Sequence, residues 1–319
     1  MSLLSWLGSH GGPAPNADEE RLLAAVVAAE PRLAAFSGWQ KRLMPAVRIS
    51  WSHAQDLVDA LPGPVCICRS AFAEDPLVHA LFASAADIPG TLAKSRELRV
   101  FLAQPGTRAA PRCFGLLGMR RQEKRVLGAA LWGDLVRGDS PQTVLYFIDH
   151  TLRGLATDLE ETRRLLKQAA FDGLLQGFCR QREGLQTRRE EVHGRLEFMR
   201  ACMKVSPADT ALAAELANCE REWQELNERL APERLLDDVV AWLSAPAERL
   251  RLDPVEVTVD GMGVEAETEV QGRGWHRLNF PELVGRDRRR WIVLLVVIPM
   301  DEALEALSRQ EEANRYIVI

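Results

Sequence analysis

Cofactor-binding and catalytic motifs are missing from this sequence of 319 residues. It holds no P-loop, no GxGxxG fingerprint, no HExxH pair, no GxSxG elbow and no EF-hand loop. We therefore expect no bound cofactor, and we favour a non-enzymatic role. An enzyme stays among the alternatives, because many enzymes carry no motif that a single sequence reveals.

Closely spaced cysteines are scarce as well. The six cysteines lie at 66, 68, 113, 179, 202 and 219, and only Cys66 and Cys68 are near each other. Because the chain has no CxxC pair, we expect neither a zinc site nor a CxxC redox motif. The spacing indicates free thiols in a reducing compartment.

No apolar run is long enough to cross a membrane. The longest, WIVLLVVIPM at residues 291–300, is about half of a membrane-spanning helix and contains Pro299. The opening stretch MSLLSWLGSHGGPAP lacks the basic segment and long apolar core of a secretory signal. We expect a cytoplasmic protein without a transmembrane helix.

Aromatic residues are few, at 6% of the chain, and the net charge is -5. Proteins that bind single-stranded nucleic acid interleave aromatic and basic side chains. Few aromatic residues lie near the basic clusters of this chain. A nucleic-acid-associated factor is therefore only a second alternative.

Two stretches repeat apolar residues at the 3.5-residue spacing of a coiled coil. The first covers residues 171–203, with apolar residues seven apart at Phe171, Phe178, Leu185, Val192 and Met199. The second covers residues 212–230, with Leu212, Leu216, Cys219, Trp223, Leu226 and Leu230. A short link containing Pro207 joins them, so we predict an antiparallel hairpin in which Val192 lies beside Trp223.

Arg182 and Arg189 interrupt the first apolar seam. Arginine can bury its aliphatic stem while its guanidinium reaches water or a carboxylate. Polar residues in such seams fix the register at some cost in stability. We interpret both arginines as structural and expect Arg182 to lie near Glu233.

The pattern on either side of the hairpin mixes helix and strand. We predict an apolar peptide and linker at 1–15, an α+β domain at 16–150, a helical hairpin with an additional short helix at 151–249, and a small sheet-plus-helix domain at 250–319. The fold class is thus multidomain α+β, with two small mixed α/β domains flanking a central antiparallel coiled-coil hairpin. In the last domain, RWIVLLVVI is expected to be a central strand and RYIVI a final strand.

Basic residues gather in one part of the chain. Residues 94–137 hold ten basic and three acidic side chains, whereas residues 205–272 hold sixteen acidic side chains and five arginines. We predict a polar turn at 122–124 that places Arg120, Arg121, Lys124 and Arg125 near a hairpin tip. These four are our candidate contact for an acidic protein partner. Alternatives are pairing with the acidic half of the chain, a second copy of the chain, anionic lipid, or an ordinary solvated surface.

Asp149 and His150 end a predicted strand, a common place for a catalytic acid–base pair. They are the candidates for an alternative function, an enzyme or small-ligand binder with a pocket nearby. Adjacent strand residues point to opposite faces, so the two side chains need not converge. We favour a structural role for both. No histidine, cysteine or acidic cluster has metal-ligand spacing, so no metal site is expected.

The first residues form a short apolar peptide that contains Leu3, Leu4, Trp6 and Leu7. The sequence GGPAP separates it from the first helical pattern. The peptide could enter a partner's groove or make weak peripheral contact with a membrane. It could equally fold onto its own domain.

These patterns together favour an adaptor or assembly subunit that acts through protein–protein contacts. The long helical hairpin and the basic segment at 94–137 are the features that carry this expectation. Self-association of the chain into a homo-oligomer stays open as a further alternative.

Overall fold

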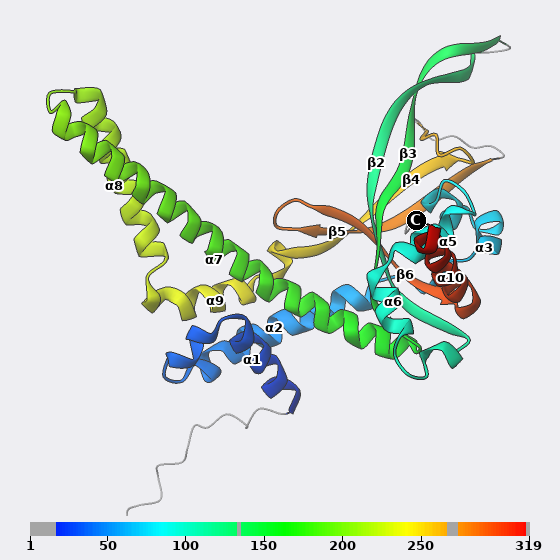
Figure 1. Ribbon diagram of the computed structural model, residues 1–319, viewed down its shortest axis with the longest axis horizontal. Coiled ribbons are helices and arrows are strands. Elements are labelled where there is room, and N and C mark those ends of the chain that lie inside the picture. Colours follow the sequence, from blue (N-terminus) through cyan, green and yellow to red (C-terminus); the bar gives the residue numbers. More distant parts are fainter. Residues whose placement is uncertain (1–16, 133–134, 267–273, 317–319) are drawn as a thin grey trace, which may run out of the picture. The chain divides into compact units, whose positions relative to one another are not determined.

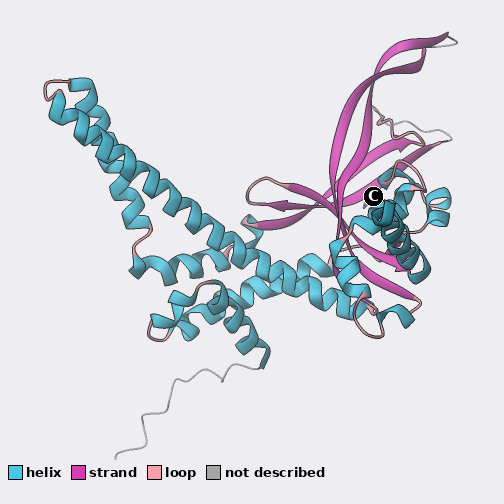
Figure 2. Ribbon diagram, viewed as in Figure 1, coloured by secondary structure: helices cyan, strands magenta, loops and turns pink. Residues whose placement is uncertain are grey.

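The computed structural model describes residues 17–132, 135–266 and 274–316, and it mixes helices with one sheet (Figure 2). The chain divides into two compact units. Unit 1 contains the described residues up to His53 together with Phe171–Pro246. Unit 2 contains Ala54–Ala170 and the described residues from Ala247 onward.

Unit 1 is helical in its described residues. Its elements are α1 (Ala17–Ala29), η1 (Pro31–Ala35), the first part of α2 (Trp39–Asp59), most of α7 (Leu159–Val205), α8 (Thr210–Arg229), η3 (Pro232–Arg234) and α9 (Leu235–Ser244). The indole of Trp242 on α9 is buried, donates to the Leu174 carbonyl oxygen at 2.9 Å and meets the ring of Phe178 edge-on. This contact fixes α9 against α7.

The α7 and α8 helices pack through the residues of the predicted seams. Leu196 and Met199 of α7 form a buried cluster with Cys219 of α8, and Leu212, Leu216 and Trp223 pack against it. The ring of Trp223 stacks on that of His193, one residue from Val192, at a centroid distance of 6.0 Å. Ion pairs from arginines of α7 to glutamates of α8 flank the seam: Arg188–Glu222 and Arg200–Glu220.

Unit 2 is built on a six-stranded sheet. Its strands are β1 (Val65–Cys66), β2 (Arg112–Trp132), β3 (Leu135–Ala156), β4 (Leu250–Asp260), β5 (Trp275–Gly285) and β6 (Arg290–Pro299). The order is β3-β2-β6-β5-β4, all antiparallel, and β1 pairs parallel to β6. The stretch predicted as a central strand is β6, which lies in the middle of this order.

Strands assigned to two separate domains in the sequence analysis belong to this one sheet. Residues of β2 pair with β6 from Arg112↔Pro299 to Met119↔Ile292. The boundary between sheet domains predicted from the sequence is therefore corrected. The physical reason lies in β6, whose two faces are both buried and whose two sides both need a hydrogen-bonded neighbour.

Helices cover both faces of the sheet, and β6 alternates between them. Ile292, Leu294, Val296 and Ile298 enter a core formed with α4 (Pro76–Leu81), α5 (Asp87–Lys94), α6 (Arg96–Leu102) and α10 (Met300–Tyr316). Val293 and Leu295 face the opposite way, against Val58 at the end of α2 and Leu166 of α7. The remaining short elements are α3 (Arg69–Glu74), η2 (Thr107–Ala109) and η4 (Pro246–Glu248).

The predicted final strand RYIVI is not seen among the described residues. Arg315 and Tyr316 end α10, and residues 317–319 lie outside the described part of the chain. The helix that starts at Met300 thus continues as far as Tyr316.

The hairpin of β2 and β3 extends far beyond the other strands as a two-stranded ribbon (Figure 1). Pairing with β6 stops at Met119, whereas β2 and β3 remain paired as far as Trp132↔Leu135. The turn predicted at 122–124 is wrong, because Gln122, Glu123 and Lys124 pair with Tyr146, Leu145 and Val144. Glu123 and Lys124 are exposed on β2, whereas the paired Leu145 of β3 is buried, so the polar run on β2 alone resembles a turn.

A short segment after β4 links the two edges of the sheet. The Leu145 amide of β3 donates to the Gly263 carbonyl oxygen at 2.8 Å, and the Glu265 amide donates to Thr143 at 2.8 Å. Val264 forms a bridge with Val144, and Glu265 forms one with Val259 of β4. Residues 263–265 therefore cover edge groups that would otherwise lack strand partners.

Candidate functional site

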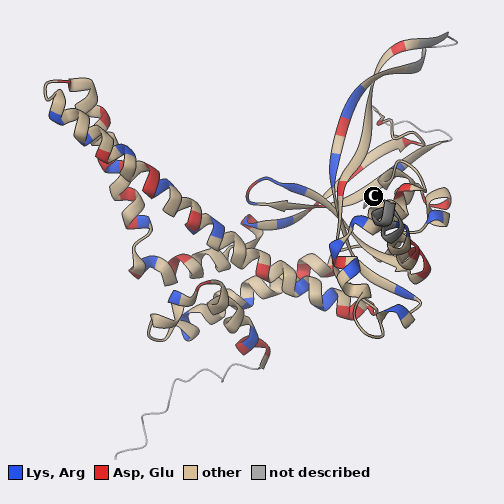
Figure 3. Ribbon diagram, viewed as in Figure 1, with Lys and Arg blue, Asp and Glu red and all other residues tan. Residues whose placement is uncertain are grey.

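The four basic residues singled out from the sequence all lie on β2, where the ribbon leaves the sheet. Figure 3 shows basic and acidic residues following one another along this strand. Two of the four already have carboxylate partners: Arg120 lies 3.3 Å from Asp149, and Arg121 lies 3.3 Å from Glu123. Their positions are mid-strand and not near the tip, since the described pairing continues to Trp132.

Lys124 and Arg125 differ from their two neighbours. Both are exposed, and among the described residues neither forms an ion pair with a carboxylate. Leu127, two residues further along the same strand, is 74% exposed. Arg125 and Leu127 lie two residues apart and share one face of the ribbon, whereas Lys124 points to the other face. An uncompensated cation beside a large exposed apolar side chain is an arrangement suited to contact with another macromolecule.

The α7 helix also exposes large apolar side chains. Phe198 is 71% exposed and Val205 is 84% exposed. They are seven residues apart, so they lie on the same face of the helix. Leu196 and Met199, by contrast, are buried against α8. An apolar stripe therefore lies outside the α7–α8 contact.

Asp149 and His150 do not converge. Asp149 has a φ of 57° at a bulge where β3 holds one more residue than β2, and its exposed carboxylate pairs with Arg120. His150 stacks on Phe82 at 5.1 Å, and its Nε2 lies 2.9 Å from the Leu81 carbonyl oxygen. Burial lowers the pKa of His150 below its ordinary value.

The space next to His150 is too small for a substrate. A cavity of about 10 Å³ lies between His150, Phe82 and Leu92, which is room for about one water molecule. The side chain of His150 therefore packs β3 against the segment that follows α4.

A larger cavity, of about 570 Å³, lies at the base of the ribbon. Four parts of the chain line it: residues 72–76 and 79–83 around α3 and α4, residues 144–147 of β3, residues 259–263, and His276 of β5. Phe72, Phe82, Tyr146 and Phe147 give it aromatic walls. His79 lies with Nε2 2.9 Å from the Gly261 carbonyl oxygen and Nδ1 3.2 Å from that of Phe72.

Sequence reasoning missed this cavity because its lining residues are spread along the chain from Phe72 to His276. The only local signal was the DGMG turn at 260–263. Asp260 folds that turn, since its Oδ1 accepts from the amides of Met262 and Val264. Volumes of this size are common for small-molecule sites.

The remaining expectations concern the N-terminal peptide, metal binding and membrane-spanning helices. Leu3, Leu4, Trp6 and Leu7 lie outside the described residues. Within the described ranges, no group of three or more histidine, cysteine or acidic side chains has a geometry for a metal ion. No helix in those ranges is both long and apolar enough to span a bilayer.

Comparison with known proteins yields no relative: no family model, no curated protein and no solved structure matches the chain. Function must therefore be argued from the contacts and surfaces of the molecule.

Proposed function

We propose that the chain is a non-enzymatic adaptor or assembly subunit that binds an acidic protein partner through the β2–β3 ribbon. The observation that supports this most is the group formed by Lys124, Arg125 and Leu127 on one stretch of β2. The two cations lack carboxylate partners among the described residues, and Leu127 is 74% exposed. Side chains on a two-stranded ribbon can meet a partner without rearrangement of the fold.

Charge gives the proposal its partner chemistry. Exposed lysine and arginine attract an acidic surface, speed its association and lose this effect as salt screens them. Arg120 and Arg121 contribute less, because Asp149 and Glu123 already compensate them. The exposed Leu127 would supply apolar contact at the centre of the interface.

The α7–α8 pair serves in this proposal as an antiparallel coiled-coil hairpin that carries a second contact. The seam cluster of Leu196, Met199 and Cys219 supports the hairpin, as do the ion pairs beside it. The stripe of Phe198 and Val205 is the part of α7 available to a partner. Self-association through this stripe is the alternative, and sedimentation of the wild type beside Phe198→Ser tests it.

The decisive experiment compares two charge reversals of equal size. Arg125→Glu changes the proposed contact, whereas Arg289→Glu changes a cation that is 80% exposed and paired with Asp287. Affinity capture from the source cells should recover a partner with wild type and with Arg289→Glu, and much less of it with Arg125→Glu. Equal recovery by all three proteins would contradict the proposal.

A small-ligand binder is the second candidate, and the cavity of about 570 Å³ supports it better than the surroundings of His150 do. Its aromatic walls suit a ligand with an apolar body. Tyr146, 41% exposed, lies in the lining, so Tyr146→Ala should leave the fold intact. A compound that raises the melting temperature of the wild type but not of this variant would favour this candidate.

The remaining proposals concern nucleic acid, membrane and location. Binding to nucleic acid would appear as a linear fall of log affinity with log salt concentration that becomes shallower in Arg125→Glu. We propose a cytoplasmic protein whose first 15 residues act in attachment and not in folding. Deleting residues 1–15 should therefore leave the melting temperature nearly unchanged but alter the location or partner binding.

A further inference from the structure

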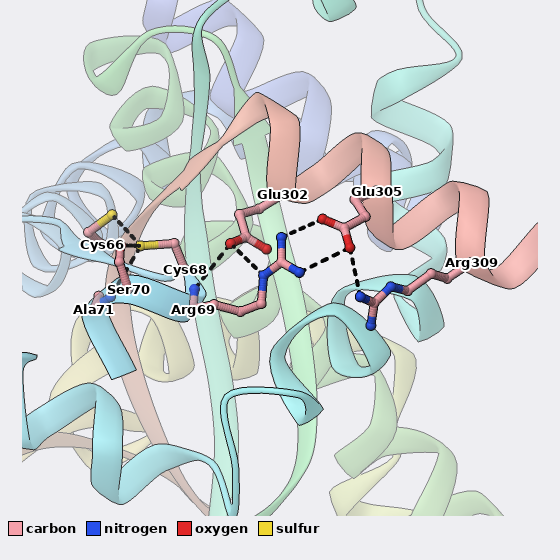
Figure 4. Close-up of polar contacts among 8 residues, drawn as sticks. All are labelled: Cys66, Cys68, Arg69, Ser70, Ala71, Glu302, Glu305 and Arg309. Carbon is pink, nitrogen blue, oxygen red and sulfur yellow. Dashed lines mark hydrogen bonds and ion pairs between the residues drawn. The ribbon is translucent and has the colours of Figure 1, made fainter. Parts of the chain in front are cut away.

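Cys66 and Cys68 lie with their sulfur atoms in contact. Their Sγ atoms are 3.7 Å apart (Figure 4). Cys66 belongs to β1, and Cys68 has the extended backbone angles φ -154° and ψ 167°. Side chains two residues apart in an extended chain point to the same side, and Ile67 between them enters the core. The backbone itself therefore places the two thiols side by side.

Both ends of this short segment are anchored. The Ile67 amide donates to Val297 of β6 at 2.9 Å. On the other side, the Arg69 amide and Nε both donate to Oε1 of Glu302 at 3.1 Å, and the Arg69 guanidinium also pairs with Glu305 of α10 (Figure 4). A pair held in this way reacts at a high effective concentration, because little freedom remains to be lost.

The two thiols differ in accessibility. Cys66 is exposed, whereas Cys68 is only 8% exposed and accepts from the Ala71 amide at 3.4 Å. An accessible thiol beside a shielded one is the arrangement in which the first meets an oxidant and the second resolves the adduct. Among the described residues, no hydrogen bond joins the sulfur atoms of any other two cysteines.

We propose that Cys66 and Cys68 form a modification site. A low-molecular-weight disulfide, such as glutathione disulfide, oxidises the two cysteines to a reversible intramolecular disulfide. The Cys66 thiolate attacks one sulfur of the oxidant, which forms a mixed disulfide and releases one thiolate that takes a proton. The Cys68 sulfur then attacks the Cys66 sulfur, which releases the second thiol. Two electrons and two protons pass from the cysteines to the oxidant, which becomes two thiols.

Partial burial of the Cys66 sulfur in this otherwise exposed residue raises the pKa of the thiol to about 11, and the neighbouring Cys68 and Glu302 act in the same direction. Only a small fraction is thiolate at neutral pH, so the reaction is slow there. Its rate should rise about tenfold per pH unit as long as the pH stays well below that pKa. A steep pH dependence is thus a signature of attack by this thiol.

Disulfide formation also has a local consequence. It turns the Cys68 sulfur toward Cys66 and away from the Ala71 amide at the start of α3. The Ala71 amide proton should therefore exchange with solvent faster in the oxidised protein than in the reduced one. Reduction with dithiothreitol should reverse the change.

The test uses the full chain, reduced and then incubated with glutathione disulfide. After denaturation and alkylation, the tryptic peptide of residues 49–69 contains both cysteines and no other. In wild type this peptide should be lighter by two hydrogen atoms and resist alkylation. In Cys68→Ser it should keep one glutathione on Cys66. In Cys66→Ser, modification of Cys68 should be at least tenfold slower.

Two outcomes with the wild type alone would overturn the proposal. One is a peptide that retains glutathione on Cys66 and does not close. The other is a peptide that remains fully open to alkylation after incubation at pH 9. Neither result depends on whether the serine variants fold.

Discussion

Nη1 of Arg182 lies 3.4 Å from Oδ2 of Asp238, and its Nη2 donates to the Leu230 carbonyl oxygen at the end of α8 at 3.4 Å. The sequence pattern predicts only that Arg182 lies near Glu233. Arg182 is only 6% exposed, and its Nε has no partner. Burial, and then the charge of Arg32, lower the pKa of Arg182. This seam arginine therefore joins α7 to α8 and α9 at an energetic cost.

Replacing the buried guanidinium with an apolar side chain of similar length should cost little. We expect the free energy of unfolding of Arg182→Met to lie within about 1.5 kcal/mol of the wild-type value or above it, because the substitution removes the unpaired Nε. Asp238→Ala should cost about 1–3 kcal/mol, since it leaves the guanidinium without its carboxylate. Urea denaturation measures both, and a larger loss in Arg182→Met would contradict this account.

The ring of Trp223, which stacks on His193, offers a measure of how much the packing of α7 against α8 contributes to the stability of the protein. Trp223 is half-buried against the cluster of Leu196 and Met199. Trp223→Ala should lower the free energy of unfolding by about 1.5–3 kcal/mol. Phe198→Ala is the matched control, because that ring is 71% exposed and should leave stability nearly unchanged. Equal melting temperatures for all three proteins would mean that α7 and α8 do not pack in solution.

The helical pair was predictable because its signal is local. Seven-residue spacing marks which face of each helix is apolar, and a short link leaves antiparallel packing as the simplest outcome. Leu196, Met199, Cys219 and Trp223 all lie where this pattern places them. The partner of Arg182 was missed because Asp238 lies on α9, whose position the seam pattern does not determine.

The sheet was predicted only in pieces. The strand β6 is recognisable from its apolar composition, but nothing local indicates that Met119 pairs with Ile292. The large cavity depends on the same long-range pairing, since it joins β3 to the turn after β4. The polar run at 122–124 was misread because Glu123 and Lys124 are exposed on β2, and the burial signal lies on the paired Leu145 of β3, far away in the sequence.

His150 predicts a measurable pH dependence. Its pKa is lowered in the folded protein by burial, so the unfolded chain binds a proton at higher pH than the folded one. The stability is therefore fully present above the ordinary histidine pKa of about 6.5 and is lost as the pH falls through the lower folded value. His150→Gln should show a smaller loss between pH 7 and pH 5 in urea denaturation. His276→Gln, at an exposed position, should follow the wild type.

Leu127 tests the ribbon without changing its charge. At 74% exposure its replacement by serine should shift the free energy of unfolding by no more than about 0.5 kcal/mol. Loss of partner recovery in Leu127→Ser would then reflect the contact itself. Leu145→Ser is the opposite control, because that side chain is 4% exposed and its replacement should destabilise unit 2. A Leu127→Ser protein that binds as well as wild type would restrict the contact to the charged residues.

Gly263 should be more sensitive to substitution than Gly261, the other glycine of the turn at 260–263. Its φ is 78°, and a Cβ there would lie 2.8 Å from the Leu145 carbonyl oxygen. Gly263→Ala therefore combines backbone strain with a clash against β3, and should cost about 1–3 kcal/mol. Gly261→Ala is the matched control in the same turn, because a Cβ at that position meets no atom within 4 Å.

The two glycine variants also separate local from global effects. The Leu145 amide donates to the Gly263 carbonyl oxygen, so its proton should exchange faster in Gly263→Ala than in Gly261→Ala. Urea denaturation gives the difference in stability, and hydrogen exchange shows where it arises. If both variants unfold alike and protect the Leu145 amide equally, residues 263–265 do not hold the edge of β3 in solution. If only Gly263→Ala loses protection, the linkage between β3 and the turn after β4 is part of the stable fold.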